Sequence, residues 1–109
     1  QAAVEQNGFA LQWASAPLRG NANVVEAAVQ QEGLALQFAS PELRSNLGIA
    51  ISAVRQNGLA LEWVSPSLIF SKHGEHIVDE ALHQNGLAVA HIPQFAEIFF
   101  KAHRAVWSR

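Results

Sequence analysis

The 109-residue sequence contains no cysteine, no methionine and no tyrosine. The absence of cysteine excludes disulfide bonds and every reaction that depends on a thiolate. For the same reason, the sequence does not indicate whether the protein works in an oxidising or a reducing compartment. Because the chain lacks methionine and begins at Gln1, we expect its N-terminus to have been trimmed, together with any signal peptide.

Charge is also scarce, since only 15% of the residues are charged and the formal net charge is −2. The basic residues are scattered, and only the tail from Lys101 to Arg109 is locally positive, so the basic stripe typical of nucleic-acid-binding proteins is missing. No run approaches the roughly 18 apolar residues that a transmembrane helix needs. Half of the residues are hydrophobic, which is typical of a folded chain. These features predict one soluble domain spanning residues 1–109, with neither nucleic acid nor membrane as a partner.

Four segments share the pattern A-[VL]-x-Q-[NE]-G-[FL]-A and align on a glycine. These glycines are Gly8, Gly33, Gly58 and Gly86. The third unit is longer than the others by three residues near Lys72-His73-Gly74. We place the repeats at about residues 3–27, 28–52, 53–80 and 81–93, and a C-terminal helix at about 94–108. Such self-similarity is typical of a stacked repeat architecture.

Each unit reads as a long helix, a glycine corner, a short helix and a proline turn. Val24, Val25, Ala28 and Val29 fall on one helical face, and Asn23 with Glu26 has the spacing of a capping box. The residues Gln31-Glu32-Gly33 predict that the long helix ends at a glycine with a left-handed backbone conformation. Residues 34–39 then have the spacing of a short helix, and a strand is disfavoured because alanine is frequent there and β-branched residues are few. The Ser-Pro pairs at 40–41 and 65–66 begin a turn or 3₁₀ segment whose leucine points to the core.

The amides at the helix ends recur in every unit, at Gln6-Asn7, Gln31, Gln56-Asn57 and Gln84-Asn85. They would lie in a row along one side of the stack. Such a ladder is a candidate binding surface, because amides form hydrogen bonds without a large desolvation cost. The alternative is that these residues are ordinary solvated helix ends.

The C-terminal segment departs from the repeat. Its apolar stripe consists of Phe95, Ile98, Phe99, Ala102 and Val106. A stack of repeats needs a cap over its last open face, and we expect this helix to supply it. Phe100 and Trp107 lie beside the stripe, where they either belong to the core or mark a surface for a partner or a second copy.

Residues that could perform chemistry mostly occupy recurring positions. Ser15, Ser40 and Ser65 are equivalent to one another, which favours helix capping over catalysis, and no G-x-S-x-G motif is present. Isolated glycines form no phosphate-binding loop. We therefore expect a protein that is not an enzyme, with no catalytic residues and no cofactor. His73 and His76, with nearby carboxylates, have a spacing that could bind zinc or nickel, but we expect surface histidines rather than a metal site.

The phrase A-V-x-Q-N-G-x-A-L-x-[WF]-A-S-x-x-L-R resembles an uncharacterised family of helical repeats of roughly 25 residues, classed as a domain of unknown function. The resemblance covers roughly residues 1–92 and is closest in the first two units, with Leu18-Arg19 and Leu43-Arg44. It weakens in the third, where Leu68-Ile69 replaces Leu-Arg. Proteins of this kind occur in protists, in algae and in the effector repertoires of intracellular bacterial pathogens. The resemblance implies a protein-binding module, secreted into a host cell if it is an effector, and suggests an inhibitor of a partner enzyme such as a ubiquitin deamidase or transglutaminase.

The sequence therefore predicts an all-α stack of four repeats closed by a C-terminal helix, and a protein–protein interaction module as its function. The predicted contact residues are Phe100, His103, Arg104, Trp107, Lys72, His73 and His76. A structural segment or self-associating scaffold, including a homodimer, is the first alternative. A histidine-based metal-binding protein is the second.

Overall fold

The computed structural model describes residues 7–89, which contain helices and no strand. Along the chain these are the 3₁₀ helices and α-helices η1 (Gly8–Trp13), α2 (Ala16–Arg19), α3 (Ala22–Gln31), η2 (Gly33–Phe38), α4 (Pro41–Arg44), α5 (Leu47–Gln56), η3 (Gly58–Trp63), α6 (Pro66–Ile69) and α7 (Gly74–Val89). The all-α class is confirmed, as is the choice of a helix over a strand after each glycine. The predicted C-terminal helix at 94–108 lies outside the described residues.

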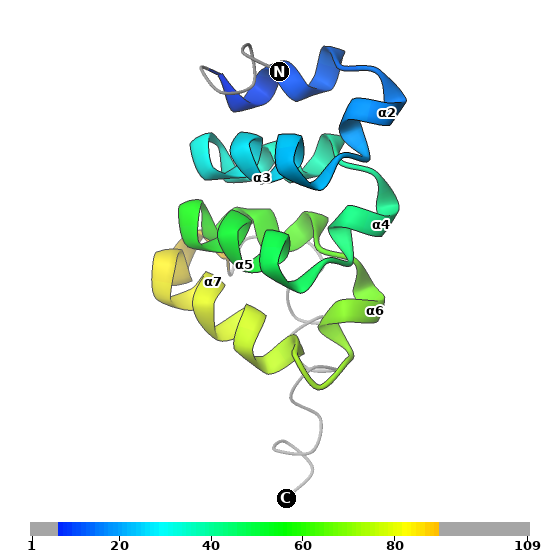
Figure 1. Ribbon diagram of the computed structural model, residues 1–109. Helices are drawn as coiled ribbons and strands as arrows, with labels where there is room; N and C mark the ends of the chain where they lie inside the picture. Colours follow the sequence, from blue (N-terminus) through cyan, green and yellow to red (C-terminus); the bar gives the residue numbers. More distant parts are fainter. Residues whose placement is uncertain (1–6, 90–109) are drawn as a thin grey trace, which may run out of the picture.

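The helices form a stack of similar layers (Figure 1). The long helices α3, α5 and α7 lie one above another, and the one-turn helices α2, α4 and α6 form a second column beside them. Two of the long helices contact the 3₁₀ helices on both sides of them in the chain: α3 contacts η1 and η2, and α5 contacts η2 and η3. The third, α7, contacts η3. Since every unit packs mainly on its neighbours, stability is built layer by layer.

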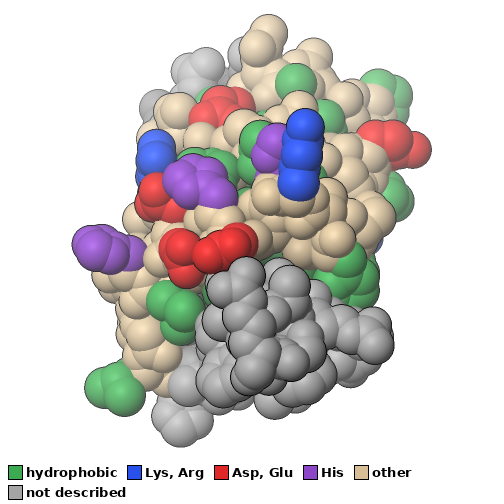
Figure 2. Space-filling model, turned by 90° about the horizontal axis from the view of Figure 1, so that it is seen from below, with side chains coloured by type: hydrophobic (Ala, Val, Ile, Leu, Met, Phe, Trp, Pro, Cys, Tyr) green, Lys and Arg blue, Asp and Glu red, His purple; other side chains and the backbone are tan. Residues whose placement is uncertain are grey.

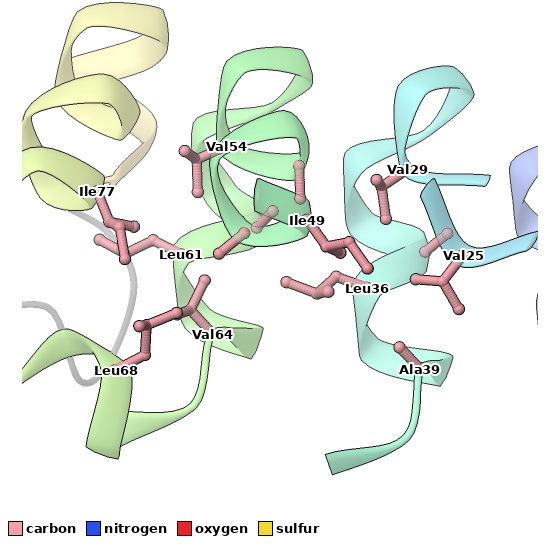
Figure 3. Close-up of a cluster of buried hydrophobic side chains, with 14 of the residues drawn as sticks. Val25, Val29, Leu36, Ala39, Ile49, Val54, Leu61, Val64, Leu68 and Ile77 are labelled. Carbon is pink, nitrogen blue, oxygen red and sulfur yellow. The ribbon is translucent and has the colours of Figure 1, made fainter. Parts of the chain in front are cut away.

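The core repeats with the same period as the sequence. Leu11, Leu36 and Leu61 are equivalent residues of η1, η2 and η3, and all three are fully buried. Figure 3 shows Leu36 among side chains of α3 and α5, and Leu61 beside Ile77 of α7. The predicted apolar face of α3, made of residues 24, 25, 28 and 29, is buried as expected. Full burial of a side chain of this size contributes about 1.5–3 kcal/mol.

An asparagine begins each of the helices α3 and α5. The side chain of Asn21 accepts hydrogen bonds from the backbone N–H groups of Asn23 and Val24 at 3.0 and 3.2 Å. Asn46 caps α5 in the same way. The predicted capping box of Asn23 with Glu26 is therefore wrong, because Asn23 already lies inside the helix.

Backbone hydrogen bonds also link the one-turn helices of successive units. The N–H of Ser40 donates to the carbonyl of Arg19 at 3.0 Å, and the N–H of Ser65 donates to the carbonyl of Arg44 at 2.9 Å. The Ser40 hydroxyl accepts from the N–H of Leu43 at 3.4 Å, as expected of a cap. The equivalent Ser15 and Ser65 make no side-chain capping bond, so the expected cap forms only at Ser40, and the Ser65 hydroxyl instead lies 3.1 Å from that of Ser67.

The glycine corners are not left-handed, which corrects the sequence-based expectation. None of the glycines in residues 7–89 has a positive φ, and the chain instead breaks at the extended residue before the glycine, as at Glu32 with φ −142° and ψ 102°. Glycine is needed because the next long helix passes so close. A Cβ built on Gly8 or on Gly33 would lie less than 3.0 Å from a helix carbonyl, that of Ala28 or of Ala53. Real Cβ atoms do not approach an oxygen so closely.

The fourth corner keeps the same backbone break. Asn85, inside α7, has φ −161° and ψ 81°, close to the values at the earlier corners. Gly86 follows it, but a Cβ built there meets no atom within 4 Å, and the neighbouring Leu87 is 83% exposed. Within residues 7–89, no helix is pressed against this corner.

Candidate partner-binding surface

The three additional residues of the third unit form an ordered turn between α6 and α7. The hydroxyl of Ser71 donates to the carbonyl of Leu68 at 2.5 Å and accepts from the N–H of His73 at 3.2 Å. The N–H of Gly74 donates to the carbonyl of Ser71 at 3.0 Å. Gly74 is required here, since a Cβ on it would overlap the backbone of Ile69. The turn therefore presents its exposed side chains from a fixed backbone.

An aromatic, a basic and two histidine side chains lie at this turn and in the first turn of α7. We call them the insertion surface: Phe70, Lys72, His73 and His76. Phe70 is 46% exposed, Lys72 and His76 are exposed, and His73 is half-buried. Figure 2, which views this end of the molecule, shows histidine, basic and acidic side chains close together on it. The structure thus brings together the three predicted contact residues of the insertion.

Phe70 was not among the predicted contact residues, although the repeat contains a signal for it. The equivalent residues of the first two units are Gly20 and Ser45, both of them small and exposed. Only the third unit places a large aromatic residue in this position. The preceding residue also changes: Ile69 stands where the other units have Arg19 and Arg44, and it is fully buried.

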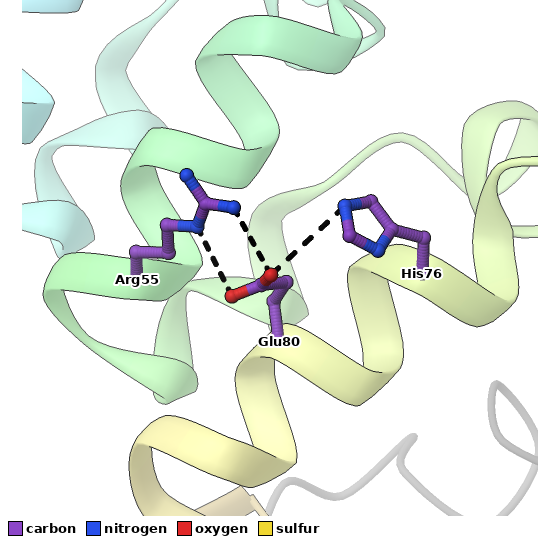
Figure 4. Close-up of polar contacts among 3 residues, drawn as sticks. All are labelled: Arg55, His76 and Glu80. Atoms are coloured by element: carbon purple, nitrogen blue, oxygen red, sulfur yellow. Dashed lines mark hydrogen bonds and ion pairs between the residues drawn. The ribbon is translucent and has the colours of Figure 1, made fainter.

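An ion pair ties α7 to α5 next to this surface (Figure 4). The guanidinium of Arg55 donates through Nε and Nη2 to both carboxylate oxygens of Glu80, at 3.0 and 3.1 Å. His76 Nε2 lies 4.0 Å from Glu80 Oε1. The hydrogen bond from Arg55 lowers the pKa of Glu80, and the same bond raises the pKa of Arg55. Because the Arg55 side chain is 60% exposed, the pair orients α7 more than it stabilises the fold.

The helix-end amides have a structural role, so the expected amide ladder is not a free surface. Oε1 of Gln56 accepts from the N–H of Gly33 at 2.5 Å, and Oε1 of Gln84 accepts from the N–H of Gly58 at 2.5 Å. Both bonds join a long helix to the corner of the preceding unit. Since these side chains hold the stack together, they are poor candidates for partner recognition.

An open groove lies between the N-terminal halves of α3 and α5. Its lining consists of Ala22, Asn23, Glu26, Asn46, Gly48, Ile49 and Ser52. The carboxylate of Glu26 already accepts from the Ser52 hydroxyl at 2.6 Å and from the Gln30 amide at 3.0 Å. This groove is therefore a polar seam between two helices, and it adds no group poised for chemistry.

The other expectations meet the structure only in part. Phe100, His103, Arg104 and Trp107 lie outside the described residues 7–89. Within that range, no three histidine, cysteine or acidic side chains lie close enough together to hold a metal ion. None of the described helices is both long and apolar enough to cross a membrane.

The fold and its contacts define a class of protein, a stack of short helical units that interlock at glycine corners. Residues 21–69 match the model of a family described as a domain of unknown function (DUF4116). The matched segment begins at the cap of α3 and ends with α6, so it contains the second corner and the third. This agrees with the predicted resemblance to an uncharacterised domain family. No curated protein and no solved structure matches the chain.

Proposed function

We propose that this protein is a non-enzymatic interaction module that binds a partner protein through the insertion surface. The observation that carries the proposal is the exposure of Phe70, in a position where the other two described units have a glycine and a serine. A half-exposed aromatic ring on a rigid turn loses little conformational freedom when a partner covers it. Aromatic residues of this kind are enriched among the residues that dominate binding energies.

The surroundings of Phe70 indicate what the partner looks like. Lys72 supplies a positive charge at the rim, and His73 and His76 add groups that can donate hydrogen bonds or become charged in mildly acidic solution. A complementary partner therefore has an apolar pocket for the ring with carboxylates around it. Charge complementarity at such a rim mainly raises the rate of association and the specificity.

A finer version of the proposal names the partner as an enzyme that this protein inhibits, for example a ubiquitin deamidase or transglutaminase. It draws its support from the resemblance to repeats found in effector repertoires, and it includes secretion into a host cell. In this version Phe100, His103, Arg104 and Trp107 contribute further contacts. Inhibition of a purified enzyme of either class by the purified protein is the direct measurement.

The general proposal is tested by affinity capture from cells of the native source, followed by titration of the captured protein in purified form. Phe70→Ser gives the third unit the residue of the second, and Lys72→Ala removes the rim charge. Ser45→Ala is the matched control, because Ser45 is the equivalent residue of the second unit. We expect Phe70→Ser to weaken binding at least about tenfold, as truncation of a central aromatic contact does, while the circular dichroism spectrum stays unchanged. Equal binding by all three variants would refute the insertion surface as the site.

A further inference from the structure

Gly48 is a glycine that the fold does not require. It is the second residue of α5, its φ is not positive, and a Cβ built on it meets only Asn46 Oδ1, at 3.5 Å. The corner glycines Gly8 and Gly33 differ, because a Cβ there would overlap the carbonyl of a neighbouring helix. Glycine also destabilises a helix relative to alanine. What Gly48 provides is therefore space on the surface of the helix.

That space is the open groove between the N-terminal halves of α3 and α5, because Gly48 is part of its lining. The residues equivalent to Gly48 are Asn23 in α3 and His76 in α7, so α5 carries the smallest residue of the three helices at this position. The groove has a volume of about 440 Å³. Sites for small ligands typically measure about 300–1,000 Å³, so the groove has room for one side chain of a partner.

The polar groups of the groove are mainly hydrogen-bond acceptors around one negative charge. Glu26 is the only charged residue among those that line it. The bonds from Ser52 and Gln30 both end on Oε1 of Glu26, which leaves Oε2 as an acceptor for a ligand. The Ser52 hydroxyl gives its proton to Glu26, so it offers a ligand its lone pairs. The groove therefore favours a positively charged group that is rich in donors.

An anion is disfavoured in the same place. The helix starts on either side of the groove are capped, since Asn21 accepts from two N–H groups of α3 and Asn46 accepts from the N–H of Ile49 in α5. These caps satisfy N–H groups that could otherwise attract an anion. The carboxylate of Glu26 repels negative charge, and the residues that line the groove include no lysine or arginine to oppose it.

Among cationic groups, a guanidinium matches the groove better than an ammonium. It is planar and carries five N–H donors in fixed directions, so it can reach acceptors on both helices at once. The side chains of Asn23 in α3 and Asn46 in α5 supply further amide oxygens to the lining. The hydrocarbon stem of an arginine can lie against the apolar residues Ala22 and Ile49.

We propose that the groove between α3 and α5 binds the side chain of an arginine presented by a partner protein. Glu26 forms an ion pair with the guanidinium, Ser52 and the two asparagines accept further hydrogen bonds, and Gly48 leaves room for the stem. The groove shares no residue with the insertion surface. The inference is therefore independent of the function proposed for that surface.

A titration of the isotope-labelled full chain with N-acetyl-arginine methylamide, followed by nuclear magnetic resonance, tests the proposal. The citrulline derivative is the matched ligand, because it has nearly the same shape but no charge. We expect the arginine derivative to shift the amide resonances of Gly48, Ile49 and Ser52 in a saturable way. It should bind at least about tenfold more tightly than the citrulline derivative, in keeping with the strength of hydrogen bonds between charged groups.

Two substitutions separate the charge of the groove from its space. Glu26→Gln removes the charge but keeps an acceptor for Ser52, and Gly48→Asn gives α5 the residue that α3 has at the equivalent position. Each should weaken binding of the arginine derivative at least about tenfold, while the circular dichroism spectrum remains that of the wild type. Glu42→Gln is the matched control, because Glu42 lies on α4, outside the lining of the groove.

Three results would overturn the proposal. The first is equal binding of the arginine and citrulline derivatives by the wild-type protein. The second is binding by Glu26→Gln or Gly48→Asn that is as tight as binding by Glu42→Gln. The third is the lack of any saturable binding of the arginine derivative in the millimolar range.

Discussion

Substitution of Gly33 by alanine tests the central feature of this fold, the close passage of a long helix over a glycine. The added methyl group would lie less than 3.0 Å from the carbonyl of Ala53 and 3.1 Å from both Asn57 N and Gln56 Oε1. All three atoms belong to the C-terminal end of α5 and its cap residue Asn57. The first of them belongs to the backbone of α5, so relief requires a movement of the helix itself.

The expected cost follows from two opposing effects. Overpacking in a tightly packed core costs about 1–3 kcal/mol, and a shift of α5 also weakens the hydrogen bond from Gly33 to Gln56. In the other direction, alanine restricts the unfolded chain more than glycine does and so stabilises the fold by about 0.4–1 kcal/mol. We expect Gly33→Ala to lower the free energy of unfolding by about 2 kcal/mol, toward the middle of the overpacking range.

Gly86→Ala is the matched control, because the same change there meets no atom within 4 Å. It should be neutral or should stabilise the protein by up to about 1 kcal/mol. The measurement is urea unfolding followed by circular dichroism, with both variants at the same protein concentration. If Gly33→Ala proved as stable as Gly86→Ala, close helix passage would not be the reason for glycine at these corners.

Three further predictions concern the core, the glycine corners and the ion pair. Leu36→Ala should cost about 2–5 kcal/mol in urea unfolding, because its side chain is completely buried between two layers. Gln56→Leu leaves the N–H of Gly33 without its acceptor and should cost about 1–3 kcal/mol, with faster amide hydrogen exchange at Gly33 as the specific sign. Glu80 has a lowered pKa because Arg55 donates hydrogen bonds to it. The stability that this pair contributes is therefore present above the pKa that Glu80 has in the unfolded chain, and it is lost as the pH falls through the pKa of Glu80 in the folded protein. The stability difference between wild type and Glu80→Gln should therefore shrink in acid, and a difference independent of pH would contradict the assignment.

Much of the architecture could be predicted from the sequence because the same short pattern occurs four times. Apolar spacing identified the buried face of α3, and the scarcity of β-branched residues excluded strands after each glycine. The role of the glycine could not be predicted in the same way. A left-handed helix end and a close helix passage both select glycine, and only the position of Ala53, twenty residues further along the chain, distinguishes them. The helix cap was misplaced by two residues, since Asn21 and Asn23 have the same capping chemistry.

The part of the candidate site that could be predicted is the part whose sequence departs from the repeat. Lys72, His73 and His76 were found because they lie at or next to an insertion. Phe70 precedes the insertion and escaped notice, since a single phenylalanine in a hydrophobic stretch looks like core. Its exposure depends on the turn that follows α6, which is fixed by the Ser71 hydrogen bonds and by Gly74.

The glycine corners also explain why recognition of a partner should depend on positions at which the units differ. Residues that the units share, such as the corner glycine, the alanine whose carbonyl lies against it and the glutamine that accepts its N–H, are already engaged between layers. A variant at Gly33 or Gln56 would therefore change stability and binding together, and a loss of binding could not be assigned to contact with a partner. Phe70 lies outside these corner contacts, and its equivalents in the first two units are a glycine and a serine. Phe70→Ser can consequently separate binding from folding, which no substitution of a corner glycine, alanine or glutamine can do.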